Sequence, residues 1–88
     1  MTTRNVTILN RAGIHARPAS LIVQAAQGYE CSIWFEKDNA KINAKSIMNI
    51  LTLGATYQTE MVLGADGPDE EAAVAELGAL FDSKFKED

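Results

Sequence analysis

The chain has 88 residues and a formal charge of −4, from eight basic and twelve acidic side chains. This length allows one domain, which we expect to span residues 1–88. The acidic balance argues against a nucleic-acid partner, because phosphate binding needs a basic face. The apolar runs are too short to span a membrane, and residues 1–9 lack the apolar stretch of a signal peptide. We therefore expect a cytoplasmic protein with no membrane insertion.

One cysteine, Cys31, and one histidine, His15, limit the chemistry further. A single cysteine cannot form an internal disulfide, which suits a reducing compartment. One cysteine and one histidine also cannot supply the usual ligands of a zinc or copper site. We predict no metal and no cofactor.

The first third of the chain predicts a strand followed by a helix. Val6–Leu9 is short and β-prone, with two threonines ahead of it. Asn10–Gly13 has the polar and glycine residues of a turn. Pro18 suits the first turn of a helix, where a missing N–H is tolerated, and Gly28 marks the end of that helix. Between them, apolar side chains recur at helical spacing: Ala19, Ile22, Val23 and Ala26.

The middle of the chain predicts a hairpin. Inward-facing and outward-facing positions alternate over residues 31–36, which is the pattern of a half-buried strand. Trp34 falls on the outer face between two polar side chains, so we expect it to be partly exposed. Residues 37–39 form the predicted turn and Ala40–Asn43 the return strand. The expected inner face consists of Cys31, Ile33 and Phe35.

A short second helix and a fourth strand follow. Ser46 is a good N-cap, and Gly54 ends the predicted helix. Ile47, Ile50 and Leu51 recur at helical spacing, and we expect either Met48 or Leu51 to be part of the core. Thr59–Leu63 is the predicted fourth strand.

The last third predicts a helix that begins after Gly67 and Pro68. The acidic residues at 69–71 lie in its first turn, where the helix dipole favours negative charge. Its apolar stripe is Val74, Leu77, Phe81 and Phe85, and we expect Lys84–Asp88 to be a solvated end. The element order β-α-β-β-α-β-α predicts an α+β fold, with the helices on one side of a sheet.

His15 has the most specific surroundings in the sequence. It lies directly before the first helix, in the segment Gly13–Ser20 (GIHARPAS). The first N–H groups of a helix have no intrahelical partner and favour a phosphate. Arg17 adds a cation for phosphate oxygens, and we expect Pro18 to hold it extended and directed toward the loop. Gly13 lets the loop bring backbone N–H groups close. The pattern predicts a histidine that accepts and releases a phosphoryl group.

A structural role for His15 is the simpler alternative, because a lone histidine is more often a surface or capping residue than a reactive one. The chain has no glycine-rich nucleotide loop and no carboxylate pair placed for metal binding. If His15 is reactive, the protein is therefore better suited to relay phosphoryl groups between larger enzymes.

The segment GIHARPAS resembles the active-site motif of the HPr family, the histidine-containing phosphocarriers of the bacterial phosphoenolpyruvate-dependent phosphotransferase system. The segment Lys45–Leu51 (KSIMNIL), the length and the element order are also similar. The resemblance implies an open-faced β-sandwich, with a four-stranded antiparallel sheet and three helices on one face. It implies that His15 accepts a phosphoryl group from enzyme I and donates it to an enzyme IIA. Arg17 would stabilise the phosphoryl group, supported by Gly13, Ala16 and Pro18.

The resemblance also implies a regulatory phosphorylation at Ser46 by an HPr kinase/phosphorylase, whereas an ordinary helix cap is the simpler interpretation. A phosphate there would lie beside an apolar docking patch. The sequence departs from the family at Asn49, where glycine is frequent, so a kinase or partner would meet a different side chain. The expected docking patch consists of Ile47, Met48 and Leu51.

Several alternatives stay open. A carrier of the nitrogen-related branch has the same histidine motif and differs in the enzyme I and enzyme IIA that accept it. A regulatory module would act only through Ser46, and a generic interaction domain would use His15 structurally. The presence of His15, Arg17 and Pro18 together favours the carrier, which we expect to be a monomer with small, transient protein contacts.

Overall fold

The elements follow the predicted order. The computed structural model describes residues 1–86. Its elements are β1 (Thr2–Thr7), α1 (Ala16–Gln27), β2 (Ser32–Lys37), β3 (Ala40–Asn43), α2 (Ile47–Thr52), β4 (Glu60–Asp66), α3 (Glu70–Asp82) and the 3₁₀ turn η1 (Lys84–Lys86). The strands form one sheet in the order β1-β4-β2-β3, and each neighbouring pair is antiparallel. The predicted α+β fold with a four-stranded antiparallel sheet and three helices is confirmed.

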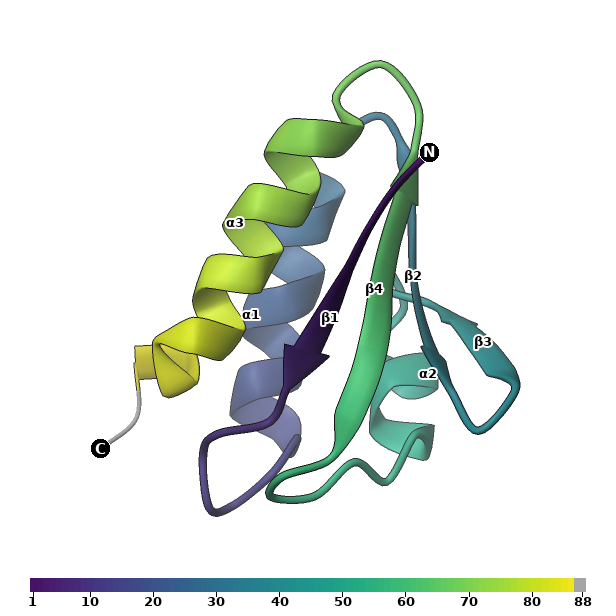
Figure 1. Cartoon of the computed structure of the whole chain (residues 1–88). Coiled ribbons are helices and arrows are strands. Elements are labelled where there is room, and N and C mark those ends of the chain that lie inside the picture. The colour runs from purple at the N-terminus through teal and green to yellow at the C-terminus, as the bar shows by residue number, and fades with distance from the viewer. Residues whose placement is uncertain (87–88) are drawn as a thin grey trace.

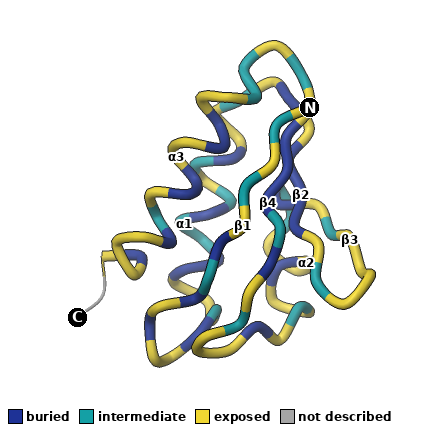
Figure 2. Tube along the Cα trace, in the orientation of Figure 1, coloured by how far each residue is buried: buried dark blue, intermediate teal, exposed yellow. Residues whose placement is uncertain are grey.

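The helices cover one face of the sheet and leave the other open (Figure 1). α3 packs over β1 and β4, α1 lies between α3 and α2, and α2 also contacts β3. Buried side chains of the sheet and the helices form one hydrophobic core. Figure 2 shows along the chain trace where the buried residues lie, in dark blue. The fully buried large side chains include Ile8, Ile22, Phe35, Leu63 and Phe81.

Two strands differ from their predicted bounds by more than one residue, since β1 spans Thr2–Thr7 in place of Val6–Leu9 and β4 ends at Asp66 in place of Leu63. β1 begins at Thr2, because all six of its residues find ladder partners on β4. β4 continues to Asp66 through Gly64 and Ala65, which are poor strand formers. Gly64 pairs with β1 on one side and with β2 on the other. Pairing on both edges therefore outweighs the weak local preference of this segment.

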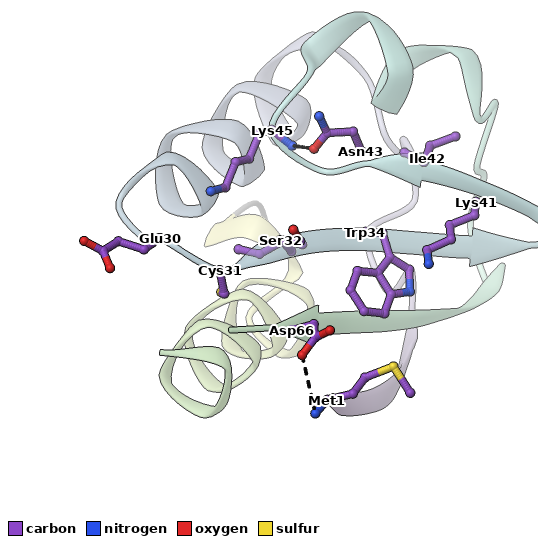
Figure 3. A pocket seen from close by; sticks show the side chains of 11 residues that line it. Met1, Glu30, Cys31, Ser32, Trp34, Lys41, Ile42, Asn43, Lys45 and Asp66 are labelled. Atoms are coloured by element: carbon purple, nitrogen blue, oxygen red, sulfur yellow. Dashed lines mark hydrogen bonds and ion pairs between the residues drawn. The ribbon is translucent and has the colours of Figure 1, made fainter. Parts of the chain in front are cut away.

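Trp34 is buried, so the prediction of a partly exposed side chain is wrong. It faces the open side of the sheet, yet only 8% of its surface is exposed. Its indole lies over Gly64, where a Cβ atom would be 2.4 Å from the ring. The Nζ atom of Lys41 lies 4.2 Å from the ring centroid (Figure 3). The indole N–H donates a 3.1 Å hydrogen bond to Glu36. The open face thus covers its tryptophan with its own side chains.

Phe85 is also buried, as its place in the predicted apolar stripe implies, so the predicted solvated end is wrong at this residue, whereas Lys84 and Lys86 are exposed as expected. α3 ends at Asp82, and Lys84, Phe85 and Lys86 adopt left-handed φ angles of 56°, 56° and 61°. This turn directs the Phe85 ring back onto Phe81, with 4.8 Å between the ring centroids. Residues 87 and 88 lie outside the described part of the chain. Apolar contact therefore orders the chain beyond the last helix.

Asp69 connects the start of α3 to the start of β2. Its carboxylate accepts hydrogen bonds from the backbone N–H groups of Glu30 at 2.9 Å and Cys31 at 3.0 Å. These bonds, first of all that from Glu30, lower the pKa of Asp69. The acidic residue predicted as a helix-start residue thus also fixes the position of a strand.

Glu70 connects the same helix start to the amino terminus. Its carboxylate accepts a hydrogen bond from the hydroxyl of Thr2 and pairs with the amino group of Met1 at 2.9 Å. The N–H of Gly67 donates to it at 3.1 Å. The hydroxyl of Thr2, followed by the amino terminus, lowers the pKa of Glu70 to about 2. The edge strand β1 is therefore attached to α3 at its first residues.

We predict that Glu70→Gln weakens the fold in a pH-dependent way. Because the folded-state pKa of Glu70 lies below its unfolded value of about 4.3, the carboxylate stabilises the fold above that value. This stabilisation is lost as the pH falls toward 2. The variant should have a lower Tm than the unchanged chain at neutral pH, and the difference should shrink between about pH 5 and pH 2. Circular dichroism during thermal unfolding measures both.

Glu71→Gln is the matched control, because Glu71 is an exposed neighbour in the same helix turn. This variant should keep the pH dependence of the unchanged chain. A Tm difference for Glu70→Gln that stays constant down to pH 2 would contradict the proposed role of the carboxylate.

Candidate functional site

His15 lies at the N-cap of α1, and it is exposed. Its backbone is extended, with φ −117° and ψ −166°, as is usual for an N-cap residue. Its carbonyl accepts the first intrahelical hydrogen bond, from the N–H of Ala19 at 3.0 Å. The imidazole is therefore held at the start of a helix, where a partner protein can reach it.

Arg17 belongs to the first turn of α1, so the prediction of an extended Arg17 is wrong. Pro18 is the third residue of the helix, and its missing N–H falls where the helix has no intrahelical acceptor. Burial of Pro18 and Ala19 against the core and the bond from Ala19 to His15 outweigh the steric preference before proline. The exposed side chain of Arg17 extends from the helix itself.

The loop before His15 is closed by hydrogen bonds from both of its ends. The N–H of Gly13 donates to the carbonyl of Asn10 at 3.1 Å, and the side-chain amide of Asn10 donates to the carbonyl of Gly13 at 2.7 Å. Ile14 donates its N–H to the carbonyl of Ala55 at 3.0 Å. Gly13 has a φ of +73°, which favours glycine. His15 is thus positioned by a fixed loop.

The segment at residues 54–56 forms the second wall of this loop. A Cβ atom on Gly13 would lie 2.8 Å from the carbonyl oxygen of Ala55 and 3.0 Å from the Cα of Thr56. In the sequence, Gly54 marks only the predicted end of a helix, and no predicted functional residue lies in this segment. No local sequence pattern predicts this contact, because it joins residues about forty positions apart in the chain.

Ser46 is the N-cap of α2, as predicted. Its hydroxyl oxygen accepts a hydrogen bond from the N–H of Asn49 at 3.4 Å. Ile50 fills the core position of this short helix. Neither Met48 nor Leu51 is part of the core, so that expectation is wrong, and 67% of the surface of Met48 is exposed. The exposed apolar residues of α2 are Ile47, Met48 and Leu51.

Helix α2, which carries the exposed apolar residues, lies at the same end of the molecule as the start of α1 (Figure 1). The two helices contact each other directly. The fold therefore places an exposed histidine and an exposed apolar surface on neighbouring elements. Exposed apolar surface beside a reactive group is typical of protein docking sites, so the predicted docking role of α2 stays a prediction.

Cys31 is not a second nucleophile at neutral pH. The side chain is buried, and burial, followed by the neighbouring Asp69, raises the pKa of the thiol to about 11. A thiol reacts as its thiolate, which this environment disfavours. The structural interpretation of Cys31 as a small core residue fits its place in the hydrophobic core.

A hollow of about 570 Å³ on the open face of the sheet is separate from His15 (Figure 3). Two of the charged groups that line this hollow already have partners within the protein. Lys45 donates from Nζ to the carbonyl of Tyr29 at 2.7 Å, and the amino group of Met1 pairs with Asp66 at 3.7 Å. The hollow is therefore no part of the histidine site.

Residues 1–86 contain neither a cluster of metal-ligating side chains nor a helix suited to span a membrane. In that part of the chain, no group of three or more histidine, cysteine, aspartate and glutamate side chains is arranged to hold a metal ion. No helix in the same range is both long and apolar enough to cross a bilayer.

Comparison with known proteins identifies the family. A family model described as the HPr component phosphorylation site of the PTS matches residues 2–83. The chain belongs to the HPr family. The phosphocarrier protein HPr of Treponema pallidum is 46% identical over the full length of both chains. The crystal structure of HPr-C-His from Thermoanaerobacter tengcongensis has a TM-score of 0.96 and 48% identity, and covers 100% of this chain and 99% of that one. HPr proteins are phosphocarriers of the phosphotransferase system.

A third relative bears on assembly. The HPr-like protein Crh of Bacillus subtilis is 40% identical over 90% of this chain and 93% of its own length. A crystal structure of Crh, with a TM-score of 0.77 and 38% identity, covers 96% of this chain and 97% of that one and is described as a dimer with a swapped domain. A monomeric state of the present chain therefore stays a prediction.

We predict that Gly13→Ala destabilises the fold more than Gly54→Ala. Both glycines have left-handed φ angles, +73° and +62°, so each substitution should cost about 1 kcal/mol in backbone strain. Only Gly13 has backbone atoms within 3 Å of an added Cβ, whereas Gly54 has none within 4 Å. The clash should add about 1–3 kcal/mol to the loss at Gly13. Urea unfolding measures both free energies, and equal losses would contradict the close packing of the loop.

Proposed function

We propose that this chain carries phosphoryl groups on His15 in the cytoplasm, accepting them from enzyme I and donating them to an enzyme IIA. The observation that supports this most directly is the exposed His15 at the start of α1, with Arg17 in the adjoining turn. A buried or poorly oriented histidine could serve a structural role only. The membership in the HPr family supports the same assignment.

The proposed transfer needs a nucleophile and a site for negative charge. A lone pair on an imidazole nitrogen of His15 attacks phosphorus, an N–P bond forms, and the bond from phosphorus to the donor group of enzyme I breaks. The donor group leaves with the electron pair. In the second transfer an acceptor on enzyme IIA attacks, and the N–P bond to His15 breaks. The two steps restore the imidazole.

The start of α1 supplies groups that stabilise the phosphoryl oxygens. The N–H groups of Ala16 and Arg17 precede the first intrahelical bond, which Ala19 donates. These N–H groups lie at the amino-terminal end of the helix, where an anion is stabilised. The guanidinium of Arg17 adds a fixed charge. Because Arg17 is exposed, its pairing with phosphate is screened by water, which lets the group leave again.

Docking of both partners is proposed to use the apolar patch of α2 as its centre and Arg17 as part of its charged rim. Apolar centres with polar rims are typical of protein interfaces. A carrier must release each partner after transfer, which suits a small interface. The patch residues are Ile47, Met48 and Leu51, and their exposure supports this role.

We predict that enzyme I, phosphoenolpyruvate and Mg²⁺ add one phosphoryl group to the chain and that mild acid removes it. Intact mass before and after acid measures both. His15→Ala should abolish the gain, because the acceptor nitrogen is lost, and should leave the circular dichroism spectrum unchanged. Ser46→Ala, the matched control, should keep the gain. Retained phosphorylation of His15→Ala would refute the assignment.

The branch of the system is tested by the choice of enzyme I. Acceptance from a sugar-branch enzyme I supports the sugar phosphotransferase system. Acceptance from a nitrogen-branch enzyme I alone would assign the chain to that branch instead. No acceptance from either would leave a regulatory or structural role for the protein and reject the carrier assignment.

Arg17→Ala should slow phosphoryl transfer by about tenfold or more, because it removes a charge that stabilises the transferring group. The free energy of unfolding should change little, since the side chain is exposed. Rapid-quench measurement of transfer from phosphorylated enzyme I gives the rate. Arg11→Ala removes an exposed arginine of the preceding turn and should have a smaller effect. Equal rates for Arg17→Ala and the unchanged chain would remove the electrostatic role.

Ser46 is proposed as a second, regulatory acceptor for an ATP-dependent HPr kinase/phosphorylase. Its half-buried hydroxyl lies at the first turn of α2, directly before the apolar patch. A phosphate at this position would place negative charge at the centre of the proposed docking surface. Ser46→Ala should abolish acid-stable phosphorylation by the kinase and keep the transfer to His15. Kinase-dependent phosphate that persists in Ser46→Ala would place the acceptor elsewhere.

A further inference from the structure

Asn10 is a buried polar residue close to the proposed site. Only 1% of its surface is exposed, and it precedes His15 by five residues. Removing a side-chain amide from water is unfavourable unless the amide is hydrogen-bonded. The position of Asn10 between a strand and a solvent-facing loop therefore calls for a specific contact.

The side-chain amide of Asn10 holds the peptide that leads to His15. It donates to the carbonyl of Gly13 at 2.7 Å, while the N–H of Gly13 donates to the carbonyl of Asn10 at 3.1 Å. An ordinary turn supplies only the second of these bonds. With both, the carbonyl and the N–H of Gly13 are each bound to Asn10, so the peptide planes on either side of Gly13 have a defined orientation.

The ends of this loop are fixed by a neighbouring segment. The N–H of Gln58 donates to the carbonyl of Ile8 at 2.7 Å, directly before the loop. The N–H of Ile14 donates to the carbonyl of Ala55 at 3.0 Å, directly after it. The middle of the loop contains Gly13, a residue with a wide choice of backbone conformations. The contact from Asn10 restrains this flexible position.

We propose that Asn10 is a positioning residue for phosphoryl transfer: its buried amide holds the Gly13 carbonyl and thereby keeps His15 in the conformation that partners recognise. This inference rests on the proposed carrier function. Without the amide, the loop would occupy further conformations, and only a fraction of molecules would be ready to dock. The apparent affinity for a partner falls by that fraction, whereas the chemistry in the docked complex stays the same.

The test is the steady-state kinetics of enzyme I with Asn10→Ala as the phosphoryl acceptor. The KM for the acceptor should rise by about fivefold to fiftyfold, according to the fraction of competent loop, and kcat should stay within about twofold. Amide hydrogen exchange, followed by NMR, should show faster exchange at Gly13 and Ile14. Exchange in the central strand, at Leu63, should rise no more than the loss of global stability requires.

Ile33→Val is the matched control, because it weakens the core on β2 without touching the loop. It should lower the unfolding midpoint and leave KM and the exchange at Gly13 unchanged. Measurements are made well below both unfolding midpoints. A rise in KM for both variants would show that stability alone is responsible and would overturn the proposal.

The remaining outcomes separate the two assignments. If the unchanged chain accepts phosphate and Asn10→Ala has the same KM, the positioning role is wrong and the carrier function stands. The same holds if exchange at Gly13 and Ile14 is unaffected. If the unchanged chain accepts no phosphate from enzyme I of either branch, the carrier function is wrong, and the positioning role is rejected with it. The proposal is supported if Asn10→Ala has a higher KM and faster exchange at Gly13 and Ile14 while Ile33→Val shows neither change.

Discussion

The antiparallel pairing of β1 with β4 determines where the candidate site forms. Because the strands run in opposite directions, the end of β1 lies beside the start of β4, with Thr7 opposite Glu60. The chain leaving β1 must therefore pass the chain entering β4. This brings Gly13 against Ala55 and lets Ile14 donate to the same carbonyl. The start of α1, with His15 at its cap, is therefore positioned by the pairing of two strands that lie outside the candidate site.

The helix start combines a rigid backbone with an exposed side chain. The hydrogen bonds of the loop hold the backbone before His15, and burial of Pro18 and Ala19 holds the backbone after it. Neither contact covers the imidazole, which stays exposed. A proline in the first turn is useful here, because it lets the helix begin without an additional N–H that needs an acceptor. The backbone around His15 is thus oriented without burial of the imidazole.

The sequence predicted the parts of the fold that depend on local patterns. The N-cap at Ser46, the hairpin between β2 and β3, and the end of α1 near Gly28 all depend on residues within a few positions of one another. The length of β4 depends on its pairing with two partner strands. Gly64 has a low strand propensity, and it belongs to β4 because it pairs with both neighbours. Local pattern predicts caps and turns more readily than how far tertiary pairing extends a strand, as the start of β1 at Thr2 also shows.

The same distinction applies to the site. His15 and Arg17 were found from a contiguous segment and a family resemblance, and both are exposed at the start of α1. The wall formed by residues 54–56 could not be found this way, because it meets the loop only in the folded chain. Trp34 shows the same limit, since its burial depends on a glycine of another strand and on Lys41 across the hairpin.

A phosphoryl carrier must keep its phosphoryl group stable until the acceptor binds, and it must still release the group readily in the second transfer. A deep pocket with desolvated charges would stabilise the phosphorylated state and slow the second transfer, because ionic contacts are stronger away from water. The start of α1 offers the opposite arrangement: an exposed imidazole, an exposed arginine and the N–H groups of one helix turn. Under the proposed function, the remaining charges and the exclusion of water come from the docked partner enzyme. For a carrier that both accepts and donates a phosphoryl group, such an exposed site is an advantage, and we propose that its precise geometry comes from the hydrogen-bonded loop before His15.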